Sequence, residues 1–220
     1  MRQLDELEGV RRLRSGILLL MLVPLLLFIV AVMAAAAAFV ALRPGYRVTV
    51  VTSGHVFAQA DSYLGPSLAA VGVAILVAAL ALVSLVLIVM AFGRLSGGFS
   101  LLSAAGRGGS IGVAGTWLVI IAIIIALLGA ALFMFGGFIA MWVAMVLAAV
   151  GFILIGVGLF EIGSSYRNGL LEAGGILVAI PFLITSFIGL ILSYVALGDI
   201  ERELQAKASQ AGAQQVTTTS

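Results

Sequence analysis

Long stretches of this sequence carry no formal charge and are long enough to cross a lipid bilayer as helices. Gly16–Leu42 and Pro66–Phe92 each run for 27 residues without a charged side chain. A helix needs about 20 apolar residues to cross about 30 Å of hydrocarbon. Because 63% of the residues are hydrophobic and only 9% are charged, the chain lacks the polar surface of a soluble globule. We therefore predict an integral membrane protein.

A third uncharged block, residues 108–160, is too long for one crossing. As a single helix it would extend for about 80 Å. Gly136-Gly137 lies near its middle, and glycine tolerates the backbone of a tight turn. We expect Ile111–Phe135 and Gly137–Phe160 to form a helical hairpin. A last uncharged stretch, Gly174–Leu197, supplies a fifth predicted span.

The spans are predicted to be helices because Ile17–Leu42 and Trp117–Phe135 are apolar throughout, whereas strands of a membrane barrel alternate apolar and polar residues. A helix also satisfies its own backbone hydrogen bonds in lipid. The predicted fold class is all-α, a polytopic bundle of about five transmembrane helices. The predicted organisation is a juxtamembrane segment 1–15, a transmembrane domain 16–198 with spans 16–42, 66–92, 111–135, 137–160 and 174–197, and a polar helix end with a disordered tail over 199–220.

The first span has an alternative interpretation as a secretory signal cleaved near Ala34–Ala38. The apolar stretch before those alanines is longer than usual for such a signal. The leading segment also carries Asp5, Glu6 and Glu8. We expect an uncleaved span.

Basic residues are retained on the cytoplasmic side of membrane proteins. With the N-terminus inside and five spans, four basic residues lie outside: Arg43, Arg47, Arg202 and Lys207. Seven lie inside: Arg2, Arg11, Arg12, Arg14, Arg94, Arg107 and Arg167. This bias predicts a cytoplasmic N-terminus and, after five crossings, an external C-terminus.

The polar segments contain few features beyond local charge pairs. Glu8 with Arg12, and Glu203 with Lys207, have the i,i+4 spacing of helical ion pairs. The only histidine, His55, lies in the predicted outer loop 43–65. A single loop histidine is expected to be solvated rather than to bind a metal.

A weak internal repeat follows the second and fourth spans. The segment FGRLSGGFSLLSA (Phe92–Ala104) resembles FEIGSSYRNGLLEA (Phe160–Ala173) with one inserted residue. This pattern suggests one leading helix followed by two parallel two-helix repeats, each with a connector on the same face. Arg94 and Glu161 would then lie at matching helix ends, where they could form an ion pair.

Small residues and prolines predict how the spans pack. Membrane helices associate through close contact of small residues. Candidate seams are Ala70/Ala74/Ala78, Ala140/Ala144/Ala148 with Gly151 and Gly158, Gly93/Gly97 and Gly108/Gly112. Pro24 and Pro181 should kink their helices. Thr185 and Ser186 could donate hydrogen bonds to carbonyls freed near Pro181.

The sequence lacks the residues that several classes of function require. No predicted span contains an ionisable side chain, the usual sign of a proton relay or an ion pathway. The absence of cysteine excludes an iron–sulfur cluster with cysteine ligands. Met141 and Met145 share a helix face, where packing explains them better than copper binding. We expect no catalytic, cofactor-binding or metal-binding residues and no cofactor. Nucleic-acid binding is not expected either, since the net charge is only +2.

Four short segments resemble an uncharacterised family of small multi-span membrane proteins from archaea, a domain of unknown function. They are LEGVRRLRSGILL (Leu7–Leu19), FGRLSGGFSLL (Phe92–Leu102), YRNGLLEAGGIL (Tyr166–Leu177) and YVALGDIERELQ (Tyr194–Gln205). The resemblance implies a protein of the archaeal cell membrane and brings no activity or functional residues with it.

Three functions remain after these exclusions. The first is a non-catalytic structural or interaction component of the cell membrane, with the lipid bilayer, itself or other membrane proteins as partners. The second is a channel or facilitator for a small neutral solute, lined by Ser84, Thr116, Thr185, Ser186 and Ser193. The third is an enzyme using Glu161, Arg167 and Glu172 on the inner connectors, whose spacing fits no known reaction; we expect no enzyme.

Overall fold

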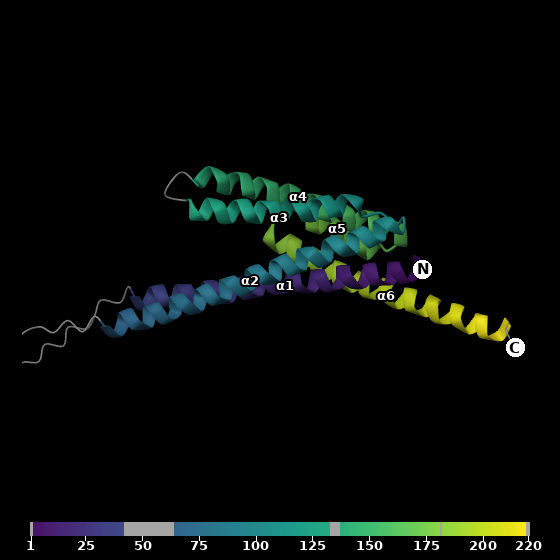
Figure 1. The fold of residues 1–220 in the computed structure, drawn as a ribbon, viewed down its shortest axis with the longest axis horizontal. Helices are drawn as coiled ribbons and strands as arrows, with labels where there is room; N and C mark the ends of the chain where they lie inside the picture. The colour runs from purple at the N-terminus through teal and green to yellow at the C-terminus, as the bar shows by residue number, and fades with distance from the viewer. Residues whose placement is uncertain (1, 42–63, 133–136, 181, 219–220) are drawn as a thin grey trace, which may run out of the picture. The chain divides into compact units, whose positions relative to one another are not determined.

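The structure, a computed structural model, describes residues 2–41, 64–132, 137–180 and 182–218. The regular secondary structure of these ranges is entirely α-helical (Figure 1). The helices are α1 (Arg2–Ala41), α2 (Leu64–Ala104), α3 (Ser110–Ala131), α4 (Phe138–Tyr166), α5 (Gly169–Ala179) and α6 (Leu183–Thr218). All except α5 are long and apolar enough to cross a membrane. The predicted all-α fold class with five candidate spans is confirmed. The predicted outer loop with His55, and Ala70 and Ala74 of one candidate seam, lie outside the residues whose side chains are described.

The chain divides into two compact units. One unit contains Val23–Val86, and its apolar side chains, such as Leu25 and Phe28, are largely exposed. The other contains Met1–Leu22 and Leu87–Ser220 and holds a continuous hydrophobic core. Its largest fully buried side chains include Phe92, Phe99, Leu13, Ile17 and Leu95.

Pairs of facing glycines set the contacts between successive helices of the larger unit. A Cβ on Gly115 of α3 would lie 2.7 Å from the carbonyl oxygen of Gly151 on α4, and a Cβ on Gly151 would lie 3.0 Å from the carbonyl oxygen of Gly115. Gly156 of α4 and Gly175 of α5 face each other in the same reciprocal way, at 2.5 and 2.6 Å. These backbones touch because neither residue has a side chain, as expected for membrane helices.

The candidate seams differ in outcome. Gly151 and Gly158 on α4 are buried in helix contacts, and Gly112 packs against the ring of Phe99. Gly93, by contrast, has no neighbour within 4 Å of where its Cβ would stand. Gly98 makes the close contact instead, since a Cβ on Gly98 would lie 2.9 Å from the carbonyl oxygen of Gly9 on α1. The spacing of small residues therefore predicts which helices pack closely more reliably than it predicts which glycine makes the contact.

The predicted hairpin between the third and fourth spans is present. α3 and α4 pack along each other, and the backbone N–H of Gly137 donates to the carbonyl of Leu132 across the turn. The end of α3 also lies close to the start of α4, since a Cβ on Gly129 would be 3.0 Å from the carbonyl oxygen of Gly137.

The two segments of the predicted internal repeat have different backbones. Phe92–Ala104 is entirely helical and forms the end of α2, twelve residues beyond the predicted span boundary. In the second segment α4 ends at Tyr166, and Arg167 adopts a left-handed backbone with φ 56°. Asn168 then caps α5 by accepting hydrogen bonds from two backbone N–H groups. Their different capping residues give the connectors different conformations despite their similar sequences.

The predicted span 174–197 is divided between two helices. α5 ends at Ala179, Ile180 has an extended backbone with φ −80° and ψ 114°, and α6 begins at Leu183. The residue before a proline is driven away from helical geometry, and proline itself cannot donate a backbone hydrogen bond. The helix therefore ends at Ala179 and a new one begins at Leu183, where the sequence predicts only a kink.

α6 runs back alongside α5. Gly189 and Ser193 of α6 face Gly174 of α5, and Gly189 also lies against Val178. The helix then continues to Thr218 through residues for which the sequence predicts a disordered tail. That range is rich in Ala and Gln, which are good helix formers.

Candidate functional site

A buried carboxylate, Glu6, joins three parts of the chain. The Arg107 guanidinium lies against both carboxylate oxygens, with Nε 3.2 Å from Oε1 and Nη2 3.3 Å from Oε2. The Tyr166 hydroxyl donates to Oε2 at 3.3 Å. Arg107 also lies over the Tyr166 ring, 5.0 Å from its centroid. We call Glu6, Arg107 and Tyr166 the Glu6 cluster.

Glycines of the α2–α3 turn allow Arg107 to reach Glu6. Gly106, Gly108 and Gly109 all have positive φ, between 77° and 90°. This is the left-handed region that glycine adopts without strain. The backbone N–H of Arg107 donates to the carbonyl of Leu102 at 2.9 Å, which closes the end of α2. The Glu6 cluster therefore depends on a glycine-rich turn.

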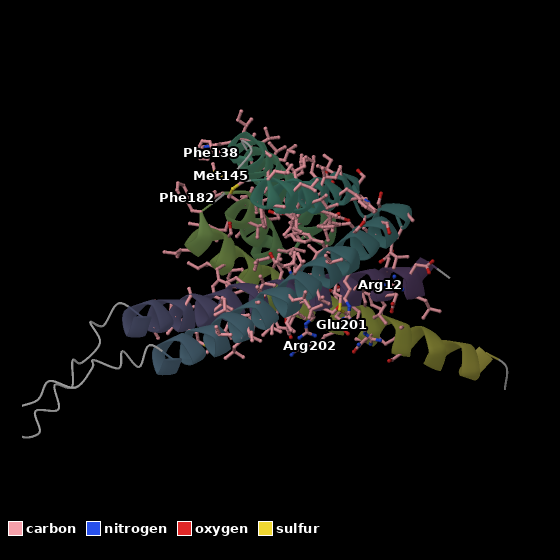
Figure 2. All side chains as sticks on the ribbon, turned by 60° about the vertical axis from the view of Figure 1, so that its left-hand side comes forward. Arg12, Phe138, Met145, Phe182, Glu201 and Arg202 are labelled. Carbon is pink, nitrogen blue, oxygen red and sulfur yellow. The ribbon has the colours of Figure 1, made fainter. Side chains whose placement is uncertain are left out.

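A second buried carboxylate, Glu201 on α6, contacts α1. Arg14 Nη1 lies 3.0 Å from Oε2, and Arg11 Nε lies 3.4 Å from Oε1. Arg14 also lies over the Tyr194 ring, 4.7 Å from its centroid. These four residues form the Glu201 cluster. Figure 2 shows Glu201 and Arg12 in the same part of the molecule, away from Phe138 and Phe182.

Both clusters combine a buried glutamate, an arginine and a tyrosine ring, and in each the arginine comes from a different part of the chain than the glutamate. A buried ion pair fixes relative positions, and removing one partner leaves a charge without compensation. The hydrogen bond that Arg107 donates to Glu6 raises the pKa of the Arg107 guanidinium above its usual value, so Arg107 stays charged. Because arginines occupy both carboxylates, this arrangement is suited to holding helices together rather than to proton transfer.

The hydroxyls proposed to line a channel are mostly bonded to their own helices. Ser84 Oγ donates to the carbonyl of Leu80 at 2.9 Å, and Thr116 Oγ1 donates to that of Val113 at 2.7 Å. Ser193 Oγ is buried and has no hydrogen-bond partner within the described part of the chain. These contacts weaken the channel hypothesis.

The hydroxyls after Pro181 bond to the region of the helix break, as the sequence predicts. Ser186 Oγ donates to the carbonyl of Ile180 at 2.8 Å. Thr185 Oγ1 donates to that of Phe182 at 2.9 Å and also lies 3.5 Å from that of Ile180. These side chains use their O–H donors on freed carbonyls.

The connector residues considered for catalysis lie near the end of α4 and the start of α5. Glu161 Oε2 accepts the backbone N–H of Gly109 at 2.9 Å and so supports the start of α3. It forms no ion pair with Arg94 among the residues the structure describes, so the predicted pair is wrong. Arg167 is the exposed C-cap of α4, and Glu172 lies in the first turn of α5 against Gly163.

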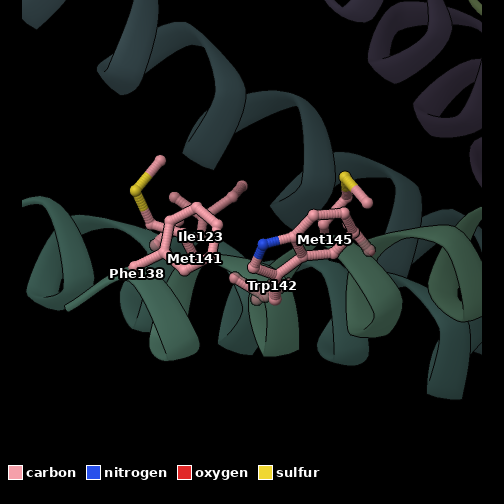
Figure 3. A pocket seen from close by; sticks show the side chains of 9 residues that line it. Ile123, Phe138, Met141, Trp142 and Met145 are labelled. Carbon is pink, nitrogen blue, oxygen red and sulfur yellow. The ribbon is translucent and has the colours of Figure 1, made fainter. Parts of the chain in front are cut away.

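An open groove of about 560 Å³ lies along α3 and α4. Figure 3 shows the side chains of Phe138, Met141, Trp142 and Met145 around it. Alanines form much of the remaining wall, including Ala144 and Ala148 of a predicted seam. The lining is almost wholly apolar, which suits contact with hydrocarbon and supplies no reactive group. Within the described ranges, no three His, Cys, Asp or Glu side chains gather as metal ligands would.

The sequence reasoning found the local ion pairs and missed the long-range ones. Glu8–Arg12 and Glu203–Lys207 form as predicted, at 2.9 and 2.7 Å. Glu6 with Arg107 joins positions 101 residues apart, and no spacing rule links them. The only sequence signal was a glutamate placed inside a basic segment next to a span.

Comparisons with known proteins identify a family. No curated protein and no solved structure matches the chain. A family model described as "Protein of unknown function (DUF973)" matches residues 6–220. That range includes all four segments on which the resemblance to an uncharacterised family rests, both glutamate clusters and the glycine contacts. The chain therefore belongs to the DUF973 family of proteins of unknown function.

Proposed function

We propose that this protein is a non-catalytic, multi-pass component of an archaeal cell membrane, with its N-terminus in the cytoplasm. The observation that carries the proposal is the use of the polar side chains. The buried carboxylates are neutralised by arginines from other parts of the chain, and four of the five candidate lumen hydroxyls bond to backbone carbonyls nearby. Few polar groups among these remain free to contact a substrate.

The exposed surface fits lipid and other membrane proteins as partners. Exposed apolar side chains cover much of α3 and α4, among them Trp117, Leu128, Ile139 and Trp142. Such a surface is expected to face hydrocarbon chains or the helices of neighbouring proteins. The cytoplasmic N-terminus is supported by Arg11, Arg12 and Arg14, which lie directly before the first span.

Solute flux tests the proposal against the channel alternative. Purified protein in liposomes is compared with empty liposomes for swelling in glycerol and urea, followed by light scattering. We expect equal rates. Faster swelling that Ser193→Leu abolishes, while the exposed control Ser100→Leu does not, would overturn the non-catalytic proposal in favour of a facilitator.

The cytoplasmic N-terminus has a separate test, because the native chain contains no cysteine. A single cysteine in the 43–65 segment, Ser53→Cys, is treated in intact cells with a membrane-impermeant maleimide. We expect labelling from outside the cell. Labelling only after the cells are opened would place the N-terminus outside.

A further inference from the structure

We infer that α5 and α6 form a re-entrant hairpin that enters and leaves the membrane on the side of the N-terminus, so that the chain crosses the membrane four times. The inference rests on the membrane location in the proposed function, but not on which side is cytoplasmic. It replaces the five crossings and the opposite chain ends that the sequence predicts.

α5 is too short to cross. It has 11 residues, which extend for about 16 Å, roughly half of the hydrocarbon thickness. Its last residue, Ala179, lies against Gly156 of α4, where the Cβ of a substituted Gly156 would be 2.6 Å from the Ala179 nitrogen. From Gly156 to its first residue, Phe138, α4 continues for about 27 Å more.

The first residue of α6 lies only slightly deeper in the membrane than the last residue of α5. Gly189 of α6 lies against Val178, and Leu183 begins the helix six residues earlier. Those six residues add about 9 Å. The point where α5 and α6 meet is therefore far short of the turn between α3 and α4, and Figure 1 shows α3 and α4 extending beyond it.

The return of α6 is fixed by its contacts with α1. Glu201 is held by Arg14, the last charged residue before the first span. Five crossings would place these residues on opposite sides of about 30 Å of hydrocarbon. Their 3.0 Å contact requires that α6 emerges where α1 enters.

The described carbonyls on either side of Pro181 have hydrogen-bond partners, as a position inside a membrane requires. The carbonyl of Ile180 accepts the Phe182 N–H at 2.8 Å and the Ser186 hydroxyl at 2.8 Å. The carbonyl of Phe182 accepts the N–H of Ser186 at 2.9 Å. Non-helical backbone at membrane depth is tolerated where its polar groups find such partners.

The charge distribution agrees with this topology. Once Arg202 and Lys207 join the N-terminal side, nine basic residues lie there, and two, Arg43 and Arg47, lie on the other side. The bias rises from seven against four to nine against two, as the positive-inside rule favours.

Cysteine labelling tests the inference in the full chain. The variants Ser100→Cys and Ser209→Cys are matched, because both serines are exposed and both donate to a carbonyl of their own helix. Ser53→Cys reports the opposite side. Each variant is labelled with an impermeant maleimide in sealed vesicles, and again after detergent treatment.

We expect Ser100→Cys and Ser209→Cys to label from the same side and Ser53→Cys from the other. If Ser209→Cys labels together with Ser53→Cys, the hairpin is not re-entrant and the inference is overturned. If the first two label together but from the cell exterior, the inference holds and only the proposed orientation fails. Detergent must make all three reactive, which shows that the cysteines are accessible.

Discussion

Arg14 of α1 and Glu201 of α6 are 187 residues apart in the sequence, yet Nη1 of the arginine lies 3.0 Å from Oε2 of the glutamate. The Tyr194 ring lies beneath the same guanidinium. This contact ties the start of the first apolar helix to the end of the last one. It adds a directional contact to the apolar packing of α6, for which lipid competes.

Removing Glu201 should destabilise the protein. Glu201→Ala leaves Arg14 and Arg11 without their carboxylate, and we expect a loss of about 1–3 kcal/mol, below the range for fully buried pairs because both arginines are partly exposed. Thermal unfolding in detergent measures the change. Glu203→Ala removes an exposed i,i+4 pair and should change stability by less than about 0.5 kcal/mol. Equal effects of the two variants would show that the Glu201 cluster has no special role.

Arg107→Lys should destabilise the Glu6 cluster even though the charge is kept. Lysine cannot contact both oxygens of Glu6 as a planar fork, nor stack on Tyr166 in the same way. We expect a loss of about 1–2 kcal/mol, comparable to one hydrogen bond to a charged group. The control is Arg94→Lys at an exposed position, which should leave the melting temperature unchanged. If Arg107→Lys left the melting temperature unchanged, the charge alone would hold the Glu6 cluster together.

Two glycine-to-alanine variants should change the stability of the protein in opposite directions. Gly156→Ala places a Cβ 2.5 Å from the Gly175 oxygen, a backbone atom that cannot move aside, so we expect a loss of about 1–3 kcal/mol. Gly93→Ala meets nothing within 4 Å and should gain up to about 1 kcal/mol from helix propensity. The close contact of α4 and α5 would be refuted if both variants melted above the native protein.

Substitutions of two serines of α6 should also differ in their effect on stability. Ser186→Ala removes the hydroxyl that the Ile180 carbonyl accepts and should cost about 1 kcal/mol. Ser193→Ala removes a buried hydroxyl without a partner in the described structure, and should leave stability unchanged or raise it by about 1 kcal/mol. Denaturation curves compare them directly. A large loss from Ser193→Ala would reveal a partner for that hydroxyl.

Composition and charge spacing predicted the features that depend on local sequence. The α3–α4 hairpin follows from an uncharged block too long for one crossing and a glycine pair at its middle. The local pair Glu8–Arg12 follows from helical spacing. The sequence also predicted that Thr185 and Ser186 would donate to carbonyls near Pro181, and both donate to the carbonyl of Ile180.

The direction of the last helix could not be predicted in the same way. Gly174–Leu197 has the length and hydropathy of a span, and hydropathy does not say how deep a residue lies. Depth is set here by Gly156 against Gly175 and by Arg14 against Glu201, contacts between residues far apart in the sequence. The glutamate clusters could not be predicted for the same reason, since the Glu6 cluster joins three parts of the chain and the Glu201 cluster joins two helices.

The distance between α1 and the exit of α6 tests the central claim most directly. Spin labels at Ser15→Cys and Arg202→Cys, next to Arg14 and Glu201, can be introduced as the only two cysteines, and their separation measured by pulsed electron resonance in liposomes. Labels on the same side should give a distribution centred well below the hydrocarbon thickness of about 30 Å. A distribution centred at or beyond that thickness would separate Arg14 from Glu201 and contradict the account.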